Sequence, residues 1–133
     1  MGSRAVSRGA QLIRQASSPN FGPRRDGLAP RYIVLHYTAM ASAAAAEARL
    51  SDPAFEVSAH YLLARSGAVT QLVAEEMRAW HAGAGAWRGQ ADMNSRSIGI
   101  ELDNEGTGPF AEPLMQALEA LLPRIMERWA IRP

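Results

Sequence analysis

The sequence predicts an α/β protein in which a central mixed β-sheet is flanked by helices. Three observations support this prediction. The β-branched apolar run at 33–35 is typical of a buried strand, and residues 97–103 alternate between apolar and polar side chains, as a strand does. Stretches with helical spacing follow these strands, and an alternation of strands with helices indicates a layered α/β fold.

The amino-acid composition excludes several classes of function. The chain has 133 residues, enough for one domain, and its 14 basic and 13 acidic side chains leave a formal net charge of +1. This balance excludes the dense basic face of a nonspecific nucleic-acid binder. The sequence contains neither cysteine nor lysine, so thiol catalysis, cysteine-ligated zinc and a Schiff-base lysine are excluded within these residues.

The sequence also bears on location. It has no run of about 18 apolar residues, so we expect no membrane span. The N-terminal arginines are not followed by the apolar core of a signal peptide, which favours a cytoplasmic location for the chain as given. A periplasmic location stays open in case the natural chain begins further upstream. Nothing in the sequence indicates an oligomeric state.

The first half of the chain divides into a lead-in and the start of the domain. Residues 1–20 are rich in Arg, Ser and Gly, so we expect a flexible lead-in there and a domain over residues 21–133. The first predicted strand ends at His36. An alanine-rich helix is predicted next, with Ser42 as its N-cap. Pro53 stops this helix, because a residue before proline is disfavoured in the α region.

The second half contains a hairpin, a strand and a long helix. Residues 57–63 and 68–73 flank a short glycine-containing turn, which predicts a β-hairpin. The alternating strand at 97–103 follows a loop rich in Trp, His and Gly. The chain then has apolar residues at helical spacing over 112–129, where we expect Pro123 to kink the helix or split it in two.

Glu101 is the carboxylate that the pattern singles out. It lies in the middle of Ile-Gly-Ile-Glu-Leu, where burying a carboxylate without a partner is costly. Gly99 is on the same strand face and leaves room for another group to approach. A desolvated glutamate has a raised pKa, which suits a general base or acid near neutrality. A solvated strand face explains the same pattern, so both interpretations stay open here.

Three histidines are available for chemistry. His36 follows an apolar strand, where layered α/β folds commonly present functional groups, and neutral imidazole is the commonest metal ligand. His81 lies beside Trp80 in a glycine-rich loop, a composition typical of a pocket wall or a packed lid. His60, inside a predicted hairpin strand, is better explained as structural. Dinucleotide-binding, calcium-loop, P-loop and HExxH patterns are absent or wrongly spaced.

Four short blocks in register carry a resemblance to a known family. They are IVLHYT at 33–38, VSAHYL at 57–62, AWHAG at 79–83 and NSRSIGIEL at 94–102. In this order and spacing, residues 18–132 resemble the zinc-dependent N-acetylmuramoyl-L-alanine amidases of type 2, which share a fold with peptidoglycan-recognition proteins. Each block alone is weak evidence for this family, and the four blocks together in this order are strong evidence for it.

The resemblance implies an activity and a role for individual residues. The activity is zinc-dependent hydrolysis of the amide between N-acetylmuramic acid and L-alanine, in peptidoglycan or in anhydromuramyl peptides. In this interpretation His36 ligates zinc, and Glu101 accepts a proton from the zinc-bound water. Trp80 and His81 line the substrate groove near the scissile carbonyl, where His81 could stabilise the oxyanion, and Asn94 contacts the muramyl peptide.

One part of the family pattern is not found in these residues. After the long helix, the family has a Gly-His-x-Asp…Asp-Pro-Gly segment that supplies two further zinc ligands and a lysine. We therefore expect a C-terminally incomplete amidase domain, with those ligands beyond Pro133. Two alternatives stay open. One is a non-catalytic module that binds muramyl peptides, and the other is a zinc site made by His36, His60 and His81.

Overall fold

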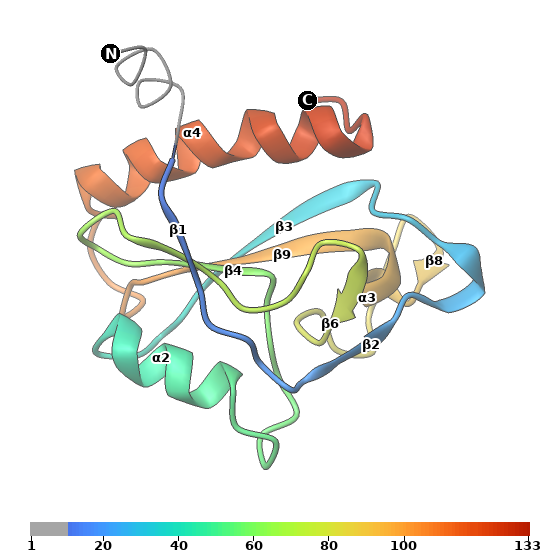
Figure 1. Ribbon diagram of the computed structural model, residues 1–133, viewed down its shortest axis with the longest axis horizontal. Helices are drawn as coiled ribbons and strands as arrows, with labels where there is room; N and C mark the ends of the chain where they lie inside the picture. Colours follow the sequence, from blue (N-terminus) through green and yellow to red (C-terminus); the bar gives the residue numbers. More distant parts are fainter. Residues whose placement is uncertain (1–10) are drawn as a thin grey trace.

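A mixed five-stranded sheet lies at the centre of the computed structural model, which describes residues 11–133 (Figure 1). Its strands, in spatial order, are β1 (Ile13–Gln15), β5 (Val69–Gln71), β4 (Tyr61–Leu63), β9 (Ser97–Leu102) and β3 (Tyr32–Tyr37). Neighbouring strands run parallel except β5 and β4, which form the predicted hairpin. Helix α4 (Glu112–Trp129) covers one face and α2 (Ala43–Leu50) covers the other. The predicted fold class is confirmed.

The remaining elements are short and surround one end of the sheet. A second small sheet pairs an early strand with one from the middle of the chain, and a third lies in the loop before β9. A short helix leads directly into β9 and fixes where that strand begins. These elements are β2 (Phe21–Pro23) with β6 (Met77–Ala79), β7 (Ala86–Trp87) with β8 (Gln90–Ala91), η1 (Arg25–Gly27) and α3 (Met93–Arg96).

Helix α4 supplies the larger part of the hydrophobic core. Its buried stripe packs against the strand face that carries Ile98, Ile100 and Leu102, so the odd-numbered residues of β9 face the other way. The helix has the predicted bounds, but the prediction that Pro123 splits it is wrong. Pro123 lies on the exposed side of the helix, where water can solvate the carbonyl that its missing N–H leaves unpaired. The stripe consists of Leu114, Ala117, Leu118, Leu121 and Ile125.

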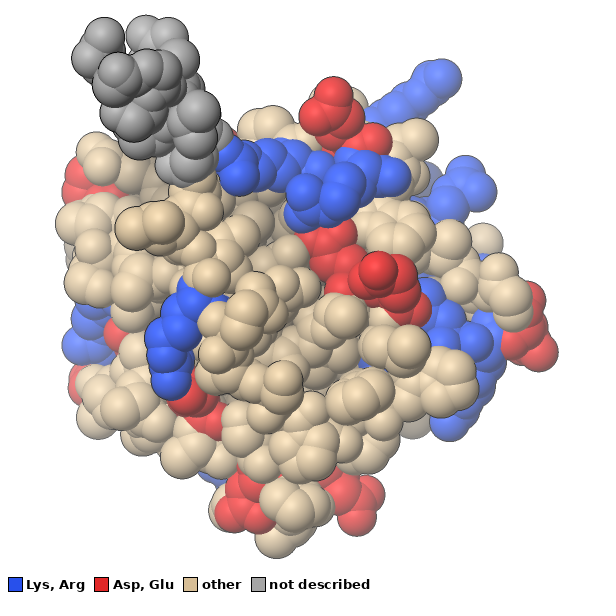
Figure 2. All heavy atoms as spheres, in the orientation of Figure 1, with Lys and Arg blue, Asp and Glu red and all other residues tan. Residues whose placement is uncertain are grey.

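Charged side chains cover the outer side of this region. Figure 2 shows basic side chains along α4 and acidic side chains immediately beneath them on the same face.

Within residues 11–133, no helix combines the length and the apolar character that crossing a bilayer requires.

Helix α2 begins as the sequence predicts. The Oγ of Ser42 accepts a hydrogen bond from the backbone N–H of Ala45 at 3.1 Å, which is N-cap geometry. On its inner side Ala46 and Leu50 pack against Leu62 of β4 and the apolar residues that follow β5. This short helix shares the second face of the sheet with the polar odd-numbered residues of β9.

Residues 11–20 are ordered, which corrects the prediction of a flexible lead-in through residue 20. β1 pairs in parallel with β5, and Ser18 and Asn20 are buried. The Oγ of Ser18 donates to the carbonyl of Leu50 at 2.6 Å, so it satisfies a carbonyl at the end of α2 that has no partner within the helix. Buried polar side chains thus fix a segment whose composition is typical of a loop. Residues 1–10 lie outside the described residues.

Candidate active site

His36 and Glu101 are neighbours across the junction of β3 and β9. The two residues are paired in register, and parallel strands lie about 4.8 Å apart, so both side chains leave the same face of the sheet. This is the α2 side, opposite the α4 core. The sequence selected the two residues separately, and the register places them together.

Gly99 provides the space that the sequence pattern indicated. A Cβ atom at this position would lie 2.5 Å from Cγ of His81, closer than non-bonded atoms approach. The His81 ring therefore packs directly on the backbone of β9 at Gly99, which is two residues before Glu101 on the same strand face. The prediction that another group approaches this glycine is confirmed, and the group is His81.

His81 connects His36 to the start of β9. Its Nδ1 lies 3.0 Å from Nε2 of His36, and its Nε2 lies 3.0 Å from Oγ of Ser97. Burial, together with the positive charges of its histidine and arginine neighbours, lowers the pKa of His81 to about 3. The ring is therefore neutral at pH 7 and both of its nitrogens are engaged. The expectation that His81 stabilises an oxyanion stays a prediction.

His60 is a structural histidine, as the sequence predicted. It is fully buried, its Nδ1 accepts the N–H of Gly99 at 3.0 Å, and its Nε2 lies 2.9 Å from the carbonyl oxygen of Met77. Burial lowers its pKa to about 4, so it too is neutral. With both nitrogens used, His60 has no lone pair for a metal.

The alternative of a three-histidine zinc site is therefore wrong. The three rings do converge, with centroids 5.2 Å apart for His36 and His81 and 6.2 Å apart for His60 and His81. Both nitrogens of His60 and of His81, however, are engaged by protein atoms, which leaves only Nδ1 of His36 for a metal. Within residues 11–133, no group of three His, Cys, Asp or Glu side chains is arranged to hold a metal ion.

Glu101 is half-buried and chemically unsatisfied. The structure gives its carboxylate no hydrogen-bond or ion-pair partner within residues 11–133. Burial alone raises its pKa to about 7. A carboxylate with this pKa can take up or release a proton near neutrality, which is the property that a general base or acid requires.

Two adjoining cavities open beside Glu101 and the histidines. A cavity of about 230 Å³ is lined by Glu101, Trp80 and His81 together with residues of α2, among them Arg49. A second cavity of about 500 Å³ is also lined by Trp80 and His81, and it adds Asn94 and basic side chains. Trp80 and His81 thus line both cavities, and their contact with a substrate stays a prediction.

Asn94 is buried and holds the loop that carries His81. Its Oδ1 accepts the backbone N–H groups of His81 and Ala82 at 2.9 and 2.8 Å. The side chain also lines the larger cavity. Asn94 therefore holds the loop in position, and its amide oxygen is already used for that purpose.

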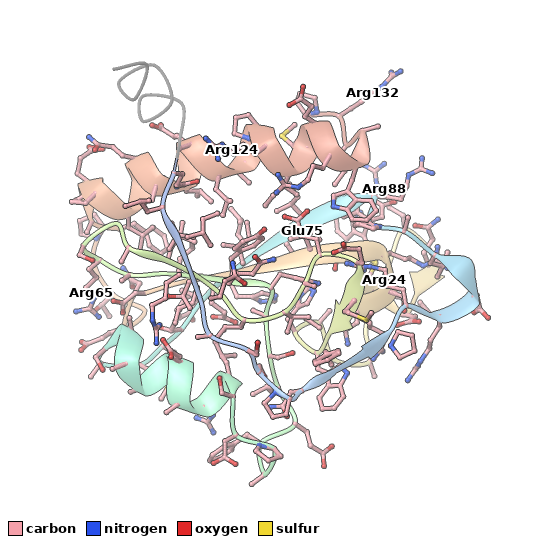
Figure 3. The ribbon with its side chains drawn as sticks, viewed as in Figure 1. Arg24, Arg65, Glu75, Arg88, Arg124 and Arg132 are labelled. Carbon is pink, nitrogen blue, oxygen red and sulfur yellow. The ribbon has the colours of Figure 1, made fainter. Side chains whose placement is uncertain are left out.

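Two further residues shape the site and were missed in the sequence. Ser97 lies on the same strand face as Gly99 and Glu101, and the period of two that selected those residues could have found it. Arg24 had no such signal. Its guanidinium, labelled in Figure 3, donates to the carbonyls of Asn94, Ser97 and Glu75. It gathers three segments that are distant in the sequence.

The donor set fits one part of a zinc site. Among residues 11–133, Nδ1 of His36 has no hydrogen-bond partner and is not sealed from solvent, and Glu101 projects from the paired position. Imidazole nitrogen is a preferred zinc ligand, and hydrolytic zinc sites commonly have three protein ligands. Residues 11–133 therefore supply one suitable ligand and an adjacent carboxylate.

Comparisons with known proteins show the family of the chain. The profile of the N-acetylmuramoyl-L-alanine amidase family matches residues 26–133. N-acetylmuramoyl-L-alanine amidase AmiD of Escherichia coli K12 is 38% identical over 119 residues, which cover 77% of this chain and 42% of AmiD. 1,6-Anhydro-N-acetylmuramyl-L-alanine amidase AmpD of Haemophilus influenzae is 31% identical over 133 residues, which cover 87% of this chain and 72% of AmpD.

A solved structure extends the likeness to the fold. The complex of E. coli AmiD with the substrate anhydro-N-acetylmuramic acid-L-Ala-D-γ-Glu-L-Lys matches with a TM-score of 0.69 at 35% identity. The match covers 93% of this chain and 49% of the AmiD chain, so the present chain spans about half the length of that relative.

Proposed function

Because this chain belongs to the N-acetylmuramoyl-L-alanine amidase family, we propose that it hydrolyses the amide between N-acetylmuramic acid and L-alanine. The substrate is peptidoglycan or an anhydromuramyl peptide derived from it. AmpD of Haemophilus influenzae is named for the anhydromuramyl form, and AmiD was solved with an anhydromuramyl tripeptide, which supports this substrate class.

The observation that carries the proposal is the state of Glu101. An unpaired, half-buried carboxylate with a pKa of about 7 lies at the wall of a cavity, beside a histidine with a free ring nitrogen. In the ionised form Glu101 accepts a proton from the attacking water. In the protonated form it donates that proton to the leaving amine, so the carboxylate is regenerated at the end of the reaction.

We assign the metal-binding role to Nδ1 of His36, with zinc as the metal. Zinc, when bound, is a Lewis acid that activates water near neutral pH and polarises the scissile carbonyl. The family resemblance predicts the other two ligands in the Gly-His-x-Asp…Asp-Pro-Gly segment, which is not among these 133 residues. A metal held by His36 would be on the sheet face that also carries Glu101, its partner in the strand register.

The muramyl peptide is proposed to lie across the two cavities. Trp80 and His81 line both, so a ligand that spans them must contact these two side chains, and Asn94 lines the second. Arg49 lines the first cavity beside Glu101, and the lining of the second has two basic and two acidic side chains, so a carboxylate of the ligand is proposed to meet Arg49 or Arg25 individually. Apolar and polar walls of this kind are typical of small-molecule sites.

Hydrolysis of anhydro-N-acetylmuramyl-L-Ala-D-γ-Glu-L-Lys by the zinc-loaded natural chain tests the proposal. Release of the free tripeptide, followed by chromatography, is the expected result. Glu101→Gln keeps the shape of the side chain but cannot accept the proton, so we expect turnover to fall by about 10²–10⁴-fold with zinc content unchanged. Glu105→Gln, the same change at an exposed position after β9, is the matched control and keeps full activity.

The possible results separate the two classes of function. No cleavage by the zinc-loaded protein, combined with tight binding of the tripeptide in calorimetry, would establish the non-catalytic binding module instead. Neither cleavage nor binding would remove both. Unchanged turnover in Glu101→Gln would remove Glu101 from the mechanism.

A further inference from the structure

A chain of hydrogen bonds runs from α3 through β9 to His36. Oγ of Ser97 lies 2.6 Å from the carbonyl oxygen of Met93 and 3.0 Å from Nε2 of His81, whose Nδ1 lies 3.0 Å from Nε2 of His36. We propose that Ser97 and His81 are positioning residues that keep the proton of His36 on Nε2 and leave Nδ1 free for a metal. This inference rests on the zinc-binding role proposed above for His36.

The hydrogen bond between Ser97 and Met93 determines which atoms donate and which accept in the rest of the series. A carbonyl oxygen can only accept a hydrogen bond, so the single hydroxyl proton of Ser97 points at Met93. The Ser97 oxygen must then accept from its other partner. Nε2 of His81 is that partner and therefore carries a proton.

The state of His81 then fixes His36. A neutral imidazole has one N–H, so with the proton on Nε2 the Nδ1 of His81 is an acceptor. The only group that the structure places there is Nε2 of His36, which must donate. A histidine that donates from Nε2 and binds a metal has its lone pair on Nδ1, so the geometry leaves this nitrogen of His36 for the metal.

The surroundings leave His81 no alternative position. Asn94 fixes the backbone of its loop, and the ring rests on Gly99, where no side chain intervenes. Arg24 holds the carbonyl of Ser97 at 3.1 Å, so the start of β9 is also fixed. His36 of β3, His81 of the loop before β7 and Ser97 of β9 are thus held in one hydrogen-bonded unit.

Such an arrangement has a known effect on metal binding. A histidine ligand normally donates its second N–H to a fixed partner, which sets the tautomer and orients the ring, and loss of that partner typically lowers metal affinity 10–100-fold. In most proteins that partner is a carboxylate or a carbonyl. Here it is a second histidine, made an acceptor by a serine.

Nitrogen NMR of the metal-free chain labelled with ¹⁵N-histidine tests the proposal directly. With only three histidines, long-range ¹H–¹⁵N correlations assign each tautomer separately. We expect the Nε2–H form for His36 and for His81. A proton on Nδ1 of His36, or a doubly protonated His81 at pH 7, overturns the proposal without any variant being made.

Ser97→Ala and Ser95→Ala form a matched pair of variants. Both serines are fully buried, but Ser95 accepts from the N–H of Arg25 and from Arg78 and has no hydrogen bond to a histidine within residues 11–133. We expect Ser97→Ala to give mixed tautomers at His81 and His36 and Ser95→Ala to leave them unchanged. Pure Nε2–H forms in folded Ser97→Ala would show that the serine does not set them.

Zinc affinity of the natural chain, measured by competition with a chelator, links the tautomer to binding. We expect a 10–100-fold loss for Ser97→Ala relative to Ser95→Ala. Equal affinities overturn the positioning role. If the unsubstituted protein does not bind zinc, the proposed function fails, while the tautomers seen by NMR still decide whether the hydrogen-bond chain exists.

Discussion

Glu75 and Glu101 are both withdrawn from water, yet the protein treats them in opposite ways. Glu75, on the α4 side, accepts hydrogen bonds from the Tyr61 hydroxyl, from two nitrogens of Arg128 at 2.9 and 2.6 Å, and from Nε1 of Trp129 at 2.8 Å (Figure 3). Burial alone would raise its pKa, but these donors and the charge of Arg128 lower it. Glu101 has no such donors, and burial raises its pKa to about 7.

The difference separates a carboxylate that holds the fold together from one that is available for chemistry. The Glu75 carboxylate ties the C-terminal turn of α4 to the loop after β5, and its remaining proton affinity is low. Glu101 is left with an uncompensated desolvation that destabilises its ionised form. Natural proteins retain such an unfavourable group mainly where a function requires it, and perturbed pKa values accordingly concentrate at functional sites.

The largest effect should come from Glu75→Gln. The amide keeps one oxygen but replaces the other with an NH₂ group, and Arg128 donates to both oxygens, so in either orientation one nitrogen of Arg128 loses its acceptor. We expect the free energy of unfolding to fall by about 2–4 kcal/mol, the lower end reflecting the partial exposure of Arg128. Urea denaturation of the metal-free chain measures this change in the free energy of unfolding. Glu101→Gln should lose no stability at pH 8, and an equal loss in both variants would remove the contrast.

The pH dependence of stability should differ in sign between the two positions. The pKa of Glu101 is about 7 in the folded chain against 4.5 as its ordinary value, so the folded state binds the extra proton between these values. Its contribution is fully present below pH 4.5 and is lost as pH rises through about 7. From pH 5 to pH 8, we expect metal-free wild type to lose about 2–3 kcal/mol relative to Glu101→Gln.

The lowered pKa of Glu75 has the opposite consequence. Its contribution is present above the ordinary pKa of 4.5 and is lost as pH falls below it. The stability difference between wild type and Glu75→Gln should therefore shrink in acid. Parallel pH profiles for the two variants, measured by thermal unfolding, would contradict both assignments.

The smallest effect is expected at Glu47, which tests whether pairing with arginine is sufficient. Glu47 accepts two hydrogen bonds from Arg14 at 2.6 and 3.0 Å, much as Glu75 does from Arg128, but this pair lies at the surface. Exposed pairs contribute little and are screened by salt. Glu47→Gln should change the melting temperature far less than Glu75→Gln, and added sodium chloride should remove what remains. A loss comparable with that of Glu75→Gln would show that burial is not the deciding factor.

Local patterns predicted most of the fold. The period of two placed Glu101 and Gly99 on one face of β9, helical spacing gave α4 its bounds, and Ser42 caps α2 as its residue type predicted. The errors arose where distant contacts override local composition. Polar residues at 11–20 read as a lead-in but satisfy carbonyls of other elements, and Pro123 is tolerated because the exposed side of α4 faces water.

The candidate site divides in the same way. The sequence by itself determined which side chains are present, that Glu101 and Gly99 share a face, and which family the blocks resemble. Only the tertiary structure decided that His36 meets Glu101 in register, that His81 fills the space over Gly99, and that Ser97 orients both histidines. The physical reason is that proton position and pKa depend on burial and on hydrogen-bond partners. Here those partners come from elements that are far apart in the chain.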